Sequence, residues 1–94
     1  MTEKNERPPL PPATFAAFVQ GLASQCLIAL GKAQNPVTGK REQDLEQAKY
    51  SIDLMEVLEE KTKGNLTEEE SKLLRGVLYE MRMMYVQLCS DGAG

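Results

Sequence analysis

The chain has 94 residues, 41% of them hydrophobic and 27% charged, which is enough for one small domain and excludes a fibre or a wholly disordered chain. Its 11 basic and 14 acidic residues give a net charge of −3, so it lacks the basic surplus that a general nucleic-acid-binding protein needs. Histidine is absent, and the cysteines Cys26 and Cys89 form no Cys-x-x-Cys motif. We therefore predict no metal site, no cofactor and no catalytic residue.

Residues 1–12 begin with a polar segment and end in a proline-rich one, residues 8–12 (PPLPP). Such a run favours extended polyproline geometry and cannot form the interior of a helix. We expect residues 1–12 to be a disordered arm, with docking into an aromatic-lined groove as the functional alternative. The acidic residues Glu3 and Glu6 cancel the nearby basic charges, so we predict no cleaved signal peptide and a cytoplasmic protein.

The first helix is expected at about residues 13–30, with Thr14 as its N-cap and Gly31 as its stop. Residues 8–31 contain no charge, and the apolar residues of this segment cover almost the whole circumference of a helix. A helix of this kind must be buried on all sides. The candidate oligomer interface consists of Phe15, Phe18, Val19, Leu22, Cys26, Leu27 and Leu30.

The second helix is expected at about residues 40–63, after a connector with turn signals at Asn35-Pro36 and Thr38-Gly39. Thr38 is the candidate cap. The apolar stripe repeats at intervals of three and four residues, and charged residues occupy the opposite side. The stripe consists of Leu45, Ala48, Ile52 and Met55, widened by Leu54 and Leu58.

The third helix is expected at about residues 68–89, followed by a frayed tail at residues 90–94. Thr67 and Glu70 form a capping box after the break at Gly64. The three acids at positions 68–70 suit the positive end of the helix dipole, and we prefer that role to cation binding. Because the second and third helices have similar lengths and a short turn between them, they predict a long antiparallel hairpin. The apolar stripe of the third helix consists of Leu74, Leu78, Met81, Tyr85 and Leu88.

Four residues that lie off this stripe give signals of their own. Gly76 is in the helix interior, where it indicates either a close helix crossing or an exposed position. Arg75 and Arg82 lie seven residues apart on one side, where we expect them to pair with acids of the second helix, with binding of an anionic ligand as the alternative. Met83 is expected at the surface, where methionine can contact varied partners.

The first helix needs more cover than one hairpin provides. Two amphipathic helices form one groove, which covers about half of a third helix, and soluble monomers rarely expose a large contiguous apolar patch. A membrane span needs about 20 apolar residues, and an in-plane membrane helix needs a basic polar face. The apolar part of this helix is shorter and carries no charge. We therefore expect a second copy to cover it, with another protein or a membrane as the other candidates.

The chain resembles a family of short bacterial proteins catalogued only as a domain of unknown function. The resemblance extends over about residues 12–88. It implies a bacterial, helical, cytoplasmic protein and assigns no reaction, ligand or functional residue. It is carried by residues 12–15 (PATF), 21–25 (GLASQ), 35–40 (NPVTGK), 44–50 (DLEQAKY), 58–67 (LEEKTKGNLT) and 78–80 (LYE).

Together these observations predict an all-α protein: a long antiparallel helical hairpin plus an apolar N-terminal helix, packed as a homodimer or higher oligomer. The function expected is that of a non-enzymatic oligomerising or adaptor protein assembled through the first helix. The alternative is a peripheral membrane factor that places the same helix on lipid.

Overall fold

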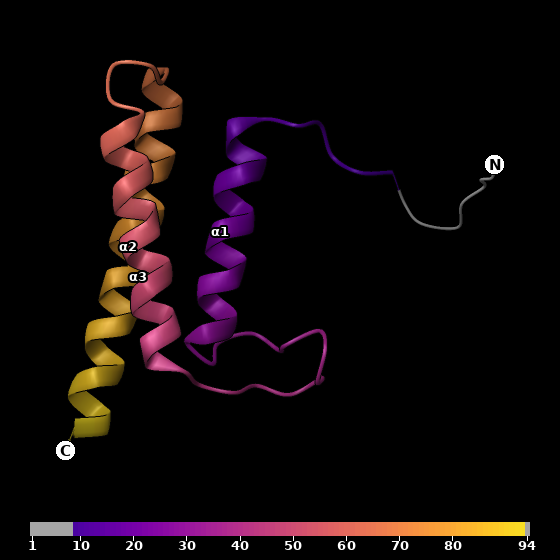
Figure 1. The fold of residues 1–94 in the computed structure, drawn as a ribbon, viewed down its shortest axis with the longest axis vertical. Coiled ribbons are helices and arrows are strands. Elements are labelled where there is room, and N and C mark those ends of the chain that lie inside the picture. The colour runs from indigo at the N-terminus through magenta and orange to yellow at the C-terminus, as the bar shows by residue number, and fades with distance from the viewer. Residues whose placement is uncertain (1–8, 94) are drawn as a thin grey trace.

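The computed structural model describes residues 9–93 and shows an all-α chain, as predicted. Its helices are α1 (Phe15–Ala29), α2 (Leu45–Lys61) and α3 (Glu68–Ala93), and the described residues contain no strand. Each helix contacts the other two. Figure 1 shows α1 and α2 running in opposite directions, and α3 reversing again alongside α2.

The core lies between the three helices and is entirely apolar within the described residues. Methionine and leucine fill much of it, which compensates for an aromatic content of only 5%. The predicted stripes of α2 and α3 supply most of these side chains. The buried residues are Val19, Cys26, Ala29, Leu30, Ala48, Ile52, Met55, Leu74, Leu78 and Met81.

Both ends of α1 follow the sequence signals. The hydroxyl of Thr14 accepts a hydrogen bond from the Ala17 N–H at 3.1 Å, which satisfies one of the free donors of the first turn. At the other end Gly31 has a φ of 77°, and its N–H donates to the Ile28 carbonyl at 3.0 Å. The Lys32 N–H donates to the Leu27 carbonyl at 2.9 Å, which completes a Schellman motif.

The start of α2 differs from the prediction. The helix begins at Leu45 rather than near residue 40, and its N-cap is Asp44, whose carboxylate accepts from the Gln47 N–H at 3.1 Å. Thr38 instead accepts from the Lys40 N–H within a turn of the connector. The Asp44 N–H donates to the Ala29 carbonyl at 2.8 Å, and Leu30 forms an isolated antiparallel bridge with Gln43. These bonds hold the chain extended until Asp44, which delays the helix.

The loop between α2 and α3 contains the predicted capping box. The Glu70 N–H donates to the Thr67 hydroxyl at 3.1 Å, and the Thr67 N–H donates to the Glu70 carboxylate at 2.9 Å. Gly64 has a φ of 81°, which an L-residue adopts only at a cost. The chain therefore reverses within residues 62–67.

Two more predicted segment boundaries shift. Helix α2 ends at Lys61 rather than residue 63, and Lys63 pairs with Glu60 at 3.3 Å. Helix α3 continues to Ala93, so residues 90–93 are helical rather than a frayed tail. Of the predicted arm, residues 1–8 lie outside the described residues, as does Gly94; residues 9–14 contain no regular secondary structure.

Candidate functional site

The structure divides the seven candidate interface residues of α1 between the core and the surface. Val19, Cys26 and Leu30 are fully buried within this single chain. Leu22 and Leu27 are half-buried against the core, and Phe15 is also half-buried. Phe18 is 54% exposed. Only one side of α1 is therefore available to another molecule.

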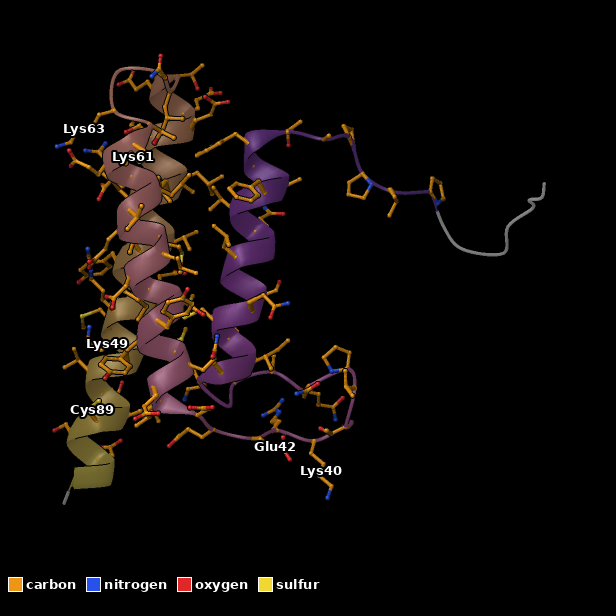
Figure 2. All side chains as sticks on the ribbon, viewed as in Figure 1. Lys40, Glu42, Lys49, Lys61, Lys63 and Cys89 are labelled. Carbon is orange, nitrogen blue, oxygen red and sulfur yellow. The ribbon has the colours of Figure 1, made fainter. Side chains whose placement is uncertain are left out.

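The available side of α1 forms one wall of an apolar groove, which α2 completes. Phe18 and Leu22 line it from α1, and Leu54, Val57, Leu58 and Lys61 line it from α2. Its volume is about 290 Å³. Figure 2 shows Lys61 at the end of α2 where the chain turns towards α3, so the groove lies near that end of the bundle.

The groove is almost free of polar groups. Helix α1 contains no charged residue, and Lys61 is the one charged side chain that lines the groove. A small polar ligand would find few hydrogen-bonding partners here. The groove is suited chemically to apolar side chains, because their contact removes apolar surface from water at no cost in buried charge.

The wall of the groove that α2 supplies was not predicted from the sequence. The core stripe predicted for α2 includes Leu54 and Leu58, whereas the structure shows Leu54 exposed and Leu58 half-buried. Tyr50, Leu54 and Val57 are all exposed and follow each other at intervals of four and three residues. That spacing marks a second apolar strip beside the core stripe, and it is the signal that could have revealed the groove.

A second hollow joins α2 and α3 near the other end of the bundle, where Figure 2 places Lys49 and Cys89 on neighbouring helices. The Lys49 ammonium pairs with the Asp53 carboxylate at 3.1 Å, and this hydrogen bond raises the pKa of Lys49. Hydrogen bonding with Cys89 is the main cause that raises the pKa of Tyr85. The contacts among these side chains therefore explain their raised pKa values.

The buried thiol of Cys26 has a different environment. It lies among apolar side chains and donates only a weak hydrogen bond to the Ala48 carbonyl, with a sulfur–oxygen distance of 3.9 Å. Burial disfavours the thiolate and raises the pKa of Cys26 from 9.0 to about 11. A thiol of this kind is inert towards nucleophilic chemistry at neutral pH.

Neither a cluster of metal-ligand side chains nor a membrane-spanning helix occurs among the described residues. Within residues 9–93, no three His, Cys, Asp or Glu side chains are grouped closely enough to hold a metal ion. Among the same residues, no helix combines the length and apolarity that crossing a membrane requires. The apolar groove between α1 and α2 is the candidate site that the packing of the described helices forms.

Comparison with known proteins identifies the family. Residues 12–87 match the family described as Domain of unknown function (DUF1844). The chain belongs to this family. No curated protein and no solved structure matches the chain.

Proposed function

We propose that the protein is a non-enzymatic homo-oligomerising or adaptor protein that assembles through the apolar groove between α1 and α2. The observation that supports this function is the groove itself, in which Phe18 of the uncharged helix α1 and Leu54 and Val57 of α2 are exposed. Exposed apolar surface of this kind on a small soluble protein marks an interaction site.

A second copy is the occupant that the geometry favours. Because α1 and α2 are antiparallel neighbours, two copies can face each other about a twofold axis and bring four helices together. Phe18 and Leu22 of one copy would then fill the groove of the other. The α2–α3 segment, taken as a long antiparallel helical hairpin, would support this interface from behind.

The non-enzymatic part of the proposal rests on composition. The sequence has no histidine, and the thiol of Cys26 is buried with a raised pKa. Both cysteines are free, which is consistent with a reducing compartment such as the bacterial cytoplasm. We place the protein there.

The test is the mass of the protein in solution, measured by light scattering across a dilution series. Wild type is expected at a multiple of 10.4 kDa. Phe18→Asp is expected to lower this mass with unchanged helix content, because a carboxylate on the groove wall would lose its hydration when the oligomer buries it. Phe18 serves better than Leu22, since Leu22 also packs against the core.

Gln20→Asp provides the matched control, because Gln20 is exposed on α1 and does not line the groove. It adds the same charge and should leave the mass unchanged. A wild-type mass of 10.4 kDa at all concentrations, or an unchanged mass for Phe18→Asp, would contradict the proposal. Co-sedimentation with anionic phospholipid vesicles would then test the lipid-binding alternative.

A further inference from the structure

Helix α3 exposes a second apolar surface, which we call the outer strip: Gly76, Tyr79, Met83 and Val86. The three side chains are between 53% and 65% exposed, and the space around Gly76 is open to 4 Å from where a Cβ would lie. The fold does not use these residues: the buried residues of α3 are Leu74, Leu78 and Met81.

The outer strip has the spacing of a coiled-coil seam. Its residues follow each other at intervals of three, four and three, which are those of the a and d positions of a heptad. At about 100° per residue, this strip lies on the side of α3 opposite the buried stripe. It is therefore directed away from α1 and α2 and is separate from the groove between them.

The flanks of the outer strip differ in charge. Arg75 and Arg82 precede Gly76 and Met83, at the positions called g in a heptad, and Glu80 and Gln87 follow Tyr79 and Val86, at the positions called e. Arg82 is engaged by Glu56 of α2, with a nitrogen–oxygen distance of 2.6 Å. Within residues 9–93, neither Arg75 nor Glu80 makes an ion pair.

We propose that the outer strip binds the outer strip of a second copy of this chain, with the two α3 helices parallel and in register. In a parallel pair, each g position meets the e position five residues further along the partner helix, so Arg75 meets Glu80 of the second copy. In an antiparallel pair, g meets g, and Arg75 and Arg82 would face arginines. The charge pattern therefore selects the parallel arrangement.

This interface goes beyond the groove of the proposed function and does not depend on it. A molecule with two different self-complementary surfaces on separate sides builds an assembly larger than a dimer, either a closed tetramer or a chain. The outer strip would then be the connection between groove-linked pairs.

Disulfide cross-linking tests both the contact and its direction. Tyr79→Cys and Val86→Cys are made separately in the full chain with Cys89→Ser, leaving the buried Cys26 in place. A disulfide needs Cα atoms within about 7 Å of each other. In a parallel, in-register pair both positions face themselves, so each variant should form a covalent dimer under mild oxidation.

An antiparallel pair gives a different result. If residue 79 faces itself there, residue 86 faces residue 72 and is about 21 Å from its own copy, so only one of the two variants could cross-link. Cross-linking of one variant alone, or of neither, would overturn the proposal. Gln20→Cys is the control at an exposed position outside the strip, and it should remain monomeric on a non-reducing gel.

The same cross-linking in a Phe18→Asp background separates this interface from the groove. The yield from Tyr79→Cys is expected to persist there, whether or not the groove itself mediates association. Loss of cross-linking in that background would overturn the independence of the outer strip.

Charge reversal tests the ion pair. Arg75→Glu places like charges together in a parallel dimer and should slow cross-linking of Tyr79→Cys about fivefold, as expected when two exposed ion pairs are lost. Adding Glu80→Arg restores opposite charges and should restore the rate. Equal rates for all three proteins would overturn the parallel register.

Discussion

The two faces of α1 are similar in composition and have different surroundings. Val19, Cys26 and Leu30 are fully buried by α2 and α3, whereas Phe18, the neighbour of Val19 in the chain, is 54% exposed. The apolar content of a helix thus does not determine which of its faces stabilises the monomer. That choice depends on how much of the helix the other two helices can cover.

Helices α2 and α3 are less ambiguous than α1. Their charged residues mark the outside, so the centre of each core stripe could be identified from spacing, although Leu54 at the edge of the α2 stripe is exposed. Pairs such as Lys49–Asp53 and Glu56–Arg82 lie on the exposed side of the bundle. Helix α1 has no charge to mark an outer face.

The largest expected difference in stability is between two variants that each place one carboxylate on a different face of α1. Val19→Asp buries a charge without a partner and should cost several kcal/mol, about as much as the whole stability of so small a domain. Phe18→Asp exposes its charge in the single chain and should change the free energy of unfolding by about 1 kcal/mol or less. Urea denaturation followed by circular dichroism measures both.

The two variants must be compared at a concentration where wild type is monomeric, so that loss of association does not count as loss of stability. A folded Val19→Asp with near-wild-type stability would mean that the buried face of α1 is open to water. An unfolded Phe18→Asp would mean that the groove side is part of the core.

A smaller effect is expected from the buried thiol when the pH rises. Folding raises the pKa of Cys26 to about 11 from 9.0, so the unfolded chain loses its proton first. The contribution of this group is complete below pH 9 and is lost as the pH rises through 11, with about 1.4 kcal/mol lost by pH 10. Denaturation midpoints between pH 8 and 10 measure the slope.

Cys26→Ala supplies the control for this slope, because other groups titrate in the same range. The variant will be less stable at every pH owing to its cavity, but its stability should fall less steeply above pH 9. Identical slopes for the two proteins would show that the thiol does not contribute.

Sequence predicted those parts of the fold that short-range bonds determine. The three helices, the Thr14 cap, the stop at Gly31 and the Thr67–Glu70 capping box each depend on contacts within a few residues. The signals for them are local and unambiguous.

The predicted start of α2 was wrong because two local signals compete there. Asp44 and Gln47 have the spacing of a capping box, but the turn residues Thr38 and Gly39 come first. The bond from the Asp44 N–H to the Ala29 carbonyl joins residues 15 positions apart and favours the later start. A contact across that distance has no signature in a local pattern.

Sequence could place the candidate interface on α1, but it could not show which face of α1 the fold leaves exposed. The groove needs Leu54 and Val57 of α2, and α1 alone gives no reason to prefer Phe18 to Val19. Only the packing of the three helices determines that Val19 is buried and Phe18 is exposed. The spacing of the outer strip of α3 is present in the sequence, but only the structure shows that these residues are exposed.

The smallest expected effect compares two glycines of the same helix region. Gly21 lies inside α1 with open space around it, so Gly21→Ala should raise the free energy of unfolding by about 0.5–1 kcal/mol. Gly31 ends the helix with a φ of 77°, and an added Cβ would meet the Gln43 Cβ at 3.4 Å. Gly31→Ala should therefore lower the free energy of unfolding by about 1 kcal/mol. Urea denaturation of the two variants measures both values, and a gain for Gly31→Ala would contradict the left-handed backbone that turns the chain towards α2.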